Sequence, residues 1–179
     1  MASVTNTQRT MTKQELIKAF YDNHKEMSDY INSLTDEQFV YSRNGKWTAG
    51  QQFSHVYLTL LPFPKILPSK EYIVQKFGKI DRPIWSYNTV IENYFKTSRQ
   101  APQQFIPEQV SPLQKEIITG DLQRILLTIQ QLLDQYTDEE LDTFVIPHPL
   151  LGKLTIREVF YLMTYHATHH LRQIEQNLE

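Results

Sequence analysis

Apolar residues recur at three- and four-residue steps through most of the chain, which is the period of an amphipathic helix. Four long segments show this pattern, and they span residues 12–34, 48–61, 113–136 and 155–178. No segment shows sustained alternation of apolar and polar residues. The pattern therefore predicts an all-α fold in which long helices pack as a bundle.

The stretch between the second and third long segments differs from the rest in its prolines. Six of the chain's nine prolines lie between Pro62 and Pro107. Pro62 and Pro64 end the second helix, because proline removes a backbone donor and clashes with the preceding turn. Within this stretch the segment 87–99 keeps a helical period. We expect a long crossover that holds one short extra helix.

Two short patterns occur once in each half of the chain. Thr35-Asp36-Glu37-Gln38 follows the first long segment, and Thr137-Asp138-Glu139-Glu140 follows the third. Both fit a capping box, in which threonine caps a helix and Gln or Glu reaches back. A Gly-Lys-X-Thr start comes next each time, at 45–48 and 152–155. Internal duplication or a repeated need for helix capping would account for the repetition of these patterns. Both explanations predict two helical hairpins.

Composition narrows the class of protein. The 179 residues suit one domain with a sizeable core, so we expect a single domain over 1–179. A net charge of −2 without a basic block excludes the footprint of a nucleic-acid binder. Cysteine is absent, which excludes disulfides and thiolate metal sites.

Residues 1–11 are polar and lack the apolar core of a signal peptide, and we expect them to be flexible. The longest apolar cluster, 56–67, is interrupted by prolines and a lysine, so we expect a cytoplasmic protein without a membrane partner.

Two histidines in the last long segment are the strongest candidates for chemistry. His166 and His170 lie four residues apart, so they share one helix face, and that face is apolar. Buried imidazoles need partners for their nitrogens. Such a pair either packs with satisfied nitrogens or binds a metal, and we favour the metal. His55 of the second segment would complete a three-histidine set, which leaves a coordination position open.

Other polar residues are candidates for the surroundings of this site. His55 shares a helix face with Gln51, Gln52 and Thr59, which indicates a wet pocket or a hydrogen-bond network around a ligand. The alternative is a partly exposed helix face. His169 projects about 100° from His170, which places it beside the site or at the surface. We expect a structural or surface role for His148, which lies between two prolines, and a surface position for His24.

The sequence contains no Ser/His/Asp nucleophile motif, no phosphate-binding glycine loop and no His-Glu-x-x-His motif. No general base is evident beside the histidines. A metal site here would therefore draw its nucleophile from water or from a thiol that comes with a substrate.

Two motifs together resemble the DinB superfamily. They are Lys46-Trp47-Thr48 followed by His55, and His166-x-x-His169-His170-x-x-Gln173. The resemblance covers residues 12–178 and implies a four-helix bundle with a divalent ion, often zinc or nickel, held by His55, His166 and His170. Leu171-Arg172-Gln173 departs from the family's commoner Arg-Gly-Gln ending, which leaves the ligands in place and the substrate open.

These observations set the expectations for the structure. We expect a four-helix up-and-down bundle that acts on a small molecule and forms a homodimer. The resemblance implies a metal-dependent enzyme, either an S-transferase that uses a low-molecular-weight thiol or a hydrolase. A non-catalytic metal- or ligand-binding bundle is the alternative. The expected pocket residues around the ligands are Gln51, Gln52, Thr59, His169 and Gln173.

Overall fold

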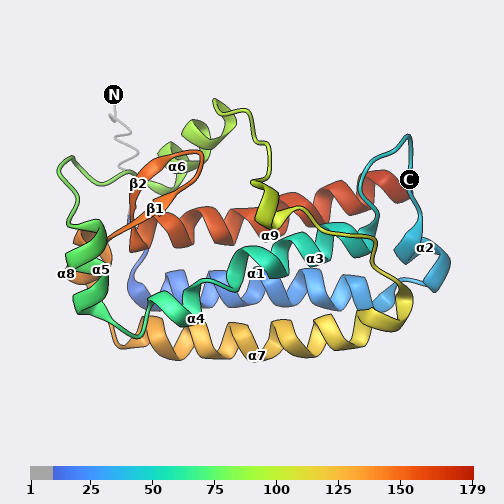
Figure 1. The fold of residues 1–179 in the computed structure, drawn as a ribbon, viewed down its shortest axis with the longest axis horizontal. Coiled ribbons are helices and arrows are strands. Elements are labelled where there is room, and N and C mark those ends of the chain that lie inside the picture. The colour runs from blue at the N-terminus through green and yellow to red at the C-terminus, as the bar shows by residue number, and fades with distance from the viewer. Residues whose placement is uncertain (1–9) are drawn as a thin grey trace, which may run out of the picture.

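Four long helices form the bundle in the computed structural model, which describes residues 10–179 (Figure 1). They are α1 (Lys13–Ser33), α3 (Ala49–Leu60), α7 (Lys115–Asp134) and α9 (Ile156–Leu178). The four-helix prediction is confirmed, and each helix end lies within two residues of the expected position. Residues 1–9 of the segment expected to be flexible lie outside the described part of the chain.

The crossover between α3 and α7 determines how the directions of the four long helices alternate. α1 and α9 run one way along the bundle and α3 and α7 run the other way (Figure 1). α1 packs against both α9 and α7, and α3 also packs against both. Direction alternates within each half, as in an up-and-down bundle. Between the halves it does not, because the crossover carries the chain back to the end of the bundle where α3 begins.

The crossover is built from short elements rather than one extra helix. They are α4 (Phe63–Ile66), α5 (Lys70–Phe77), α6 (Tyr87–Phe95) and the 3₁₀ turns η1 (Gln103–Phe105) and η2 (Pro112–Gln114). α6 is the helix expected at 87–99, and it ends four residues earlier. α6 packs on α9 and η1 packs on α3. The crossover therefore covers the two helices that the histidines come from.

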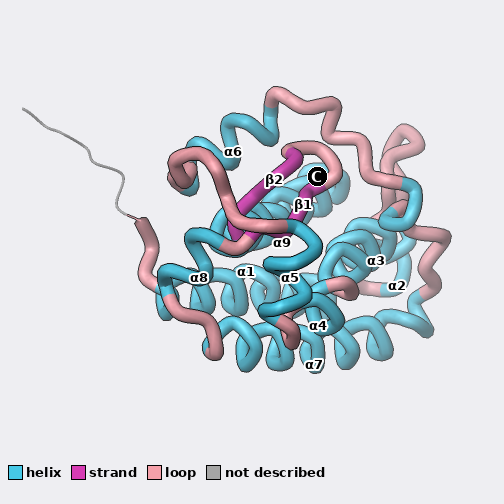
Figure 2. Tube along the Cα trace, turned by 60° about the vertical axis from the view of Figure 1, so that its left-hand side comes forward, coloured by secondary structure: helices cyan, strands magenta, loops and turns pink. Residues whose placement is uncertain are grey.

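Two strands form a hairpin that the sequence pattern did not predict. β1 (Val145–His148) pairs antiparallel with β2 (Gly152–Thr155), and His148 lies opposite Gly152. Figure 2 shows this hairpin beside α9. Strands of four residues are too short to display a sustained alternation, and Pro147 interrupts the pattern further. Within residues 10–179 the all-α expectation holds outside this hairpin and one isolated bridge between Lys79 and Phe144.

The predicted capping motifs form in both halves. The side-chain oxygens of threonines 35, 48, 137 and 155 each accept from the backbone nitrogen of the third residue of a helix, and the backbone nitrogen of each threonine donates to the side chain of that third residue. The helices after the first and third caps are α2 (Asp36–Val40) and α8 (Asp138–Thr143). Gly45 and Gly152 have φ of 73° and 70°, a left-handed conformation that glycine adopts without strain. These turns fix the residues at which α3 and α9 begin. They therefore also fix the positions of the histidines along the two helices.

α9 lies at the centre of the molecule. It packs against α1, α3, α6, α8 and the hairpin. Phe160 of α9 contacts the rings of Phe20 and Phe63 at centroid distances of 5.1 and 4.9 Å. Because α9 is covered on most sides, polar residues of its sequence are carried into the interior. Within residues 10–179, no helix combines the length and apolar character needed to cross a bilayer.

Candidate metal centre

Three imidazoles converge between α3 and α9. The Nε2 atom of His166 lies 3.1 Å from Nε2 of His55 and 3.0 Å from Nε2 of His170. All three side chains are buried, with 5–6% of each residue exposed. The helical spacing of His166 and His170 accounts for one side of the cluster, and the packing of α3 on α9 brings His55 to it. The structure thus brings together the three residues named as candidate ligands.

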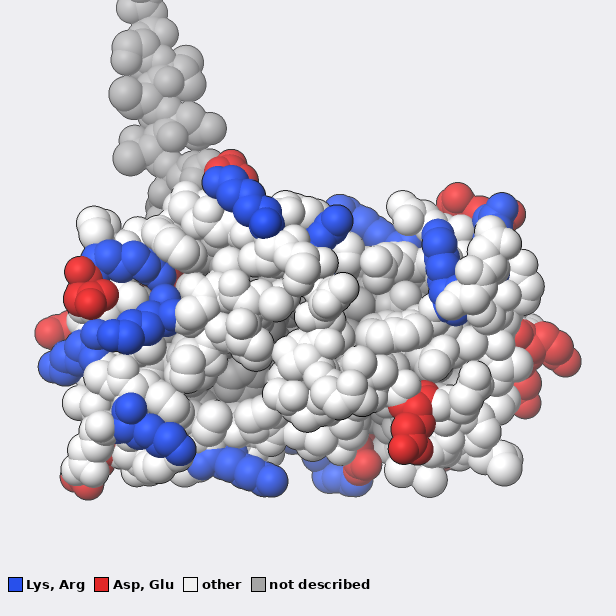
Figure 3. Space-filling view, turned by 45° about the horizontal axis from the view of Figure 1, so that its top comes forward, with Lys and Arg blue, Asp and Glu red and all other residues white. Residues whose placement is uncertain are grey.

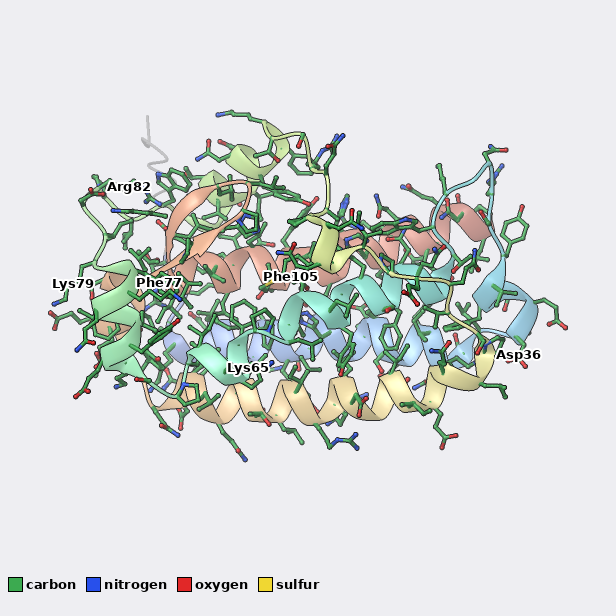
Figure 4. The ribbon with its side chains drawn as sticks, in the orientation of Figure 1. Asp36, Lys65, Phe77, Lys79, Arg82 and Phe105 are labelled. Atoms are coloured by element: carbon green, nitrogen blue, oxygen red, sulfur yellow. The ribbon has the colours of Figure 1, made fainter. Side chains whose placement is uncertain are left out.

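Hydrogen bonds at the far side of two rings fix which nitrogen faces the cluster. His55 Nδ1 donates to the carbonyl oxygen of Phe105 at 2.7 Å, and Figure 4 labels Phe105 where the crossover passes α3 and α9. His170 Nδ1 donates to Oε1 of Gln52. A neutral imidazole that donates from Nδ1 keeps a lone pair at Nε2. Both rings therefore present a lone pair to the common point.

The Nδ1 atom of His166 is different. It is buried and has no hydrogen-bond partner among residues 10–179. Its Nε2 faces the Nε2 atoms of the other two rings. A hydrogen on Nε2 of His166 serves at most one of the other two lone pairs well and leaves Nδ1 as an unpaired acceptor, whereas a hydrogen on Nδ1 leaves three lone pairs facing one another.

The three rings of the cluster carry no extra proton near neutral pH. Burial lowers the pKa of His55, and it lowers the pKa values of His166 and His170 well below the usual 6.5. A positive charge on His55 or His170 lowers the pKa of His166 further, and a positive charge on His55 does the same to the pKa of His170. All three rings are therefore neutral at pH 7, which is the form that binds metal.

The spacing of the nitrogens fits a small divalent ion. Nitrogens 2.0–2.1 Å from a tetrahedral zinc ion are about 3.3 Å apart. The two Nε2 separations of 3.1 and 3.0 Å are close to that value, and the candidate ligand atoms all lie within 4.8 Å of one another. Because the tautomers of His55 and His170 are also fixed, the three histidines fit a divalent ion of the size of zinc.

A cavity of about 830 Å³ opens onto the cluster. That size suits a small organic molecule. Gln52, Thr59, His169 and Gln173 line it, as expected. Gln51 does not. Its side chain accepts from the backbone nitrogen of Thr48 at 3.0 Å and completes the cap of α3.

The remaining histidines have separate positions. His169 lines the cavity, stacks on Tyr165 at a centroid distance of 5.7 Å, and does not join the cluster. His148 ends β1 and lines the cavity, and its Nδ1 accepts from the backbone nitrogens of Leu150 and Leu151. Burial lowers the pKa of His148 to about 4.

The surface position expected for His24 is wrong. Its exposure is 1%, and burial lowers its pKa to about 4. α1 is covered by α9 and α7, so its buried face is wide. The signal was present in the sequence, since His24 lies four residues after Phe20 and three before Met27, both of which are fully buried.

Several cavity residues were not identified from the sequence. Phe105 contributes a backbone carbonyl from the crossover, and no side-chain pattern could reveal that contact. Arg99 and Lys46 line the cavity from two loops. Lys46 stands in the quoted tryptophan motif, but its spacing gave no reason to place it beside the histidines.

Comparison with known proteins gives the family and agrees with the fold. A model of the DinB superfamily matches residues 19–174. No curated protein matches significantly in sequence. Among solved structures, YfiT from Bacillus subtilis superposes with a TM-score of 0.61 and 18% identity, over 98% of this chain and 89% of that one. YfiT is described as a probable metal-dependent hydrolase with an unusual four-helix bundle topology. At this identity the likeness concerns the fold.

Proposed function

The chain belongs to the DinB superfamily, and from this premise we propose that it is a metal-dependent enzyme that transfers a small thiol to an electrophilic molecule. The observation that carries the proposal is the convergence of three neutral Nε2 atoms on a cavity of small-molecule size. His55, His166 and His170 would hold the ion. Three imidazoles without a thiolate suit zinc or nickel.

When bound, a divalent ion with three neutral ligands keeps its double charge and lowers the pKa of a thiol or water at its open position. The chain itself fixes two ligand rings through Phe105 and Gln52, and the apolar side chains of Leu162 and Met163 line the cavity beside them. Transfer then forms a bond from sulfur to the electrophilic carbon. The leaving group departs with the bonding electron pair, and the thiol proton passes to solvent.

The lack of an acidic side chain favours a thiol over water. No Asp or Glu occurs among the described residues that line the cavity, so no carboxylate takes a proton there. A free thiol has a pKa of about 8.5 and water one of about 15.7, so the thiol needs far less help to ionise.

Hydrolysis of a small substrate is the second candidate. It is favoured by the description of YfiT, which shares the fold, as a probable metal-dependent hydrolase. The cavity geometry accommodates either reaction, since both use the same open position. The two candidates differ in the nucleophile, and that difference is measurable.

Titration of the cobalt-loaded protein with 2-mercaptoethanol tests the proposal. We expect the visible spectrum to change at millimolar thiol, and we expect thiol-dependent conversion of 1-chloro-2,4-dinitrobenzene. The His166→Ala variant is the matched control and should show neither. An unchanged spectrum with hydrolysis of p-nitrophenyl acetate would replace the transferase by the hydrolase. Metal binding without either activity would contradict both and leave a non-catalytic binding protein.

The homodimer expected from the family resemblance remains a prediction. Light scattering on the zinc-loaded protein measures it directly. A mass near 42 kDa, twice the chain mass of 21.2 kDa, is the expected result. A mass of one chain would contradict it.

A further inference from the structure

The cavity-lining side chains of α9 change in character along the helix. Val159, Leu162 and Met163 are apolar, the next group consists of His166, His169 and His170, and the last comprises Gln173, Gln176 and Asn177. From Val159 to Asn177 the helix rises about 27 Å. One wall of the cavity therefore passes from apolar, through the candidate metal centre, to amide-rich.

The opposite walls follow the same gradient. Ile146 and Leu150 of the hairpin region, together with Phe63 of α4, line the cavity near the apolar start of α9. Lys46 and Trp47 lie near its amide-rich end, where the side-chain nitrogen of Asn177 donates to the carbonyl of Trp47 at 3.3 Å. A ligand that spans the cavity would therefore meet apolar groups at one end and polar groups at the other.

The charged residues of the lining are all cationic. Among the described lining residues, Lys46 and Arg99 carry charge and no carboxylate does. Neither cation forms an ion pair with a residue in 10–179. On the face shown in Figure 3, charged side chains lie mainly toward the edges and a broad uncharged area occupies the centre. A cavity with charge of one sign concentrates ligands of the other sign.

Arg99 has a second unusual feature, which is its backbone. Its φ is 54°, a left-handed conformation that a non-glycine residue adopts at an energetic cost. The residue lies close enough to His169 for its charge to lower the pKa of that ring, after the larger effect of burial. The guanidinium carbon of Arg99 lies 5.3 Å from the ring centroid of Phe95, so the strained turn holds a cation in the cavity lining near His169.

We propose that this cavity selects an amphiphilic anion, whose apolar part lies toward the hairpin and whose carboxylate or similar group lies toward Arg99 and Lys46. The inference deepens the proposed function, because such a molecule would be the substrate or the thiol at the same site. The anionic group is held by exposed cations, so its contribution is modest and weakens with salt. The apolar end supplies affinity that depends on chain length.

Isothermal titration with 4-phenylbutyrate and 4-phenylbutanol, which are similar in shape and differ in charge, tests the proposal. In the metal-free protein we expect the acid to bind about fivefold more tightly than the alcohol, as two exposed ion pairs allow. Butyrate, without the ring, should bind at least tenfold more weakly than 4-phenylbutyrate. Zinc-loaded protein is titrated in parallel.

Variants distinguish the contribution of Lys46 and Arg99 to anion binding from that of the metal. K46Q/R99Q should bring the two affinities within twofold, and K96Q, which removes a nearby exposed lysine outside the cavity, should leave the preference unchanged. A preference that survives in K46Q/R99Q, or that appears only with zinc, would overturn the proposal. Failure of the protein to bind zinc would contradict the proposed function instead, since the metal-free titration does not depend on it.

Discussion

Gln52 holds the ring of His170, because its Oε1 atom accepts the hydrogen of Nδ1. Partners of this kind orient a ligating imidazole and raise its basicity. Gln52→Leu keeps a similar volume but removes the acceptor, so we expect zinc affinity to fall roughly 10–100-fold. Competition with a chromophoric chelator measures the change. Thr59→Val, also in the cavity lining, should keep wild-type affinity, and an equal loss there would contradict the assignment.

His148 makes the stability of the metal-free protein depend on pH. Its pKa is about 4 in the folded protein because of burial, and the unfolded value is about 6.5. Between these values the unfolded state binds more protons, so stability rises with pH and is lost as pH falls below 6.5. The expected slope is about 1.4 kcal/mol per pH unit from this residue at most.

Urea unfolding of metal-free protein at pH 6.5 and pH 5 measures this slope. His148→Asn keeps an acceptor for the hairpin turn but does not titrate. We expect the variant to lose about 1–2 kcal/mol less than wild type over the interval. Identical losses in the two proteins would show that His148 is not responsible.

At the scale of elements, Gly50 lets α2 and the crossover approach the start of α3. A Cβ atom at this position would lie 2.7 and 2.8 Å from ring carbons of Phe39 and 3.2 Å from Cβ of Val110. Phe39 is fully buried and belongs to the hydrophobic core. We expect Gly50→Ala to destabilise the protein by about 1–3 kcal/mol in denaturant unfolding.

Gly120 provides a control of opposite sign. It lies within α7, and the nearest atom to an added Cβ would be the end of the Arg124 side chain at 3.9 Å. Gly120→Ala should therefore stabilise the protein by about 0.5–1 kcal/mol through helix propensity. Effects of the same sign in the two variants would contradict the packing described at α3.

Glu158 ties the crossover to the first turn of α9. Its carboxylate accepts from Arg82 at 2.8 and 2.9 Å and from the backbone nitrogen of Trp85 at 2.6 Å, and the side chain is 1% exposed. Figure 4 shows Arg82 at the end of the molecule where α9 begins. Glu158→Gln should cost about 3 kcal/mol, because a partly buried guanidinium loses its counter-charge.

Hydrogen exchange distinguishes this tie from a purely local effect. In Glu158→Gln the amides of α6 (Tyr87–Phe95), which follows Trp85, should exchange faster. Glu175→Gln, at an exposed position of the same helix, should change neither stability nor exchange. A stability change below about 0.5 kcal/mol in Glu158→Gln would show that the tie is unimportant.

At the scale of the whole molecule, local patterns were predictable and long-range contacts were not. The four long helices and the pairing of His166 with His170 depend on a 3.6-residue period, which the sequence displays. The β1–β2 hairpin and the contact from Phe105 depend on which segments meet after folding. The burial of His24 belongs with the local patterns, because His24 shares the helix face of Phe20 and Met27.

Gln51 and Gln52 illustrate the limit within a single helix face. Both were expected around the ligands because both lie near His55 on the helical wheel. Gln51 occupies the third position of α3 and completes its capping box, which directs its side chain back along the backbone. Gln52, one position later, reaches His170. A capping position is recognisable in the sequence, so this distinction was available before the structure.

The central claim is that His55, His166 and His170 bind one divalent ion, and metal stoichiometry tests it most directly. Zinc-loaded protein, freed of excess metal by gel filtration and assayed by elemental analysis, should hold about one ion per chain. His55→Ala, His166→Ala and His170→Ala should each lose most of it, and His169→Gln should keep it. Full stoichiometry in all three alanine variants, or metal loss in His169→Gln with His166→Gln still loaded, would contradict the account.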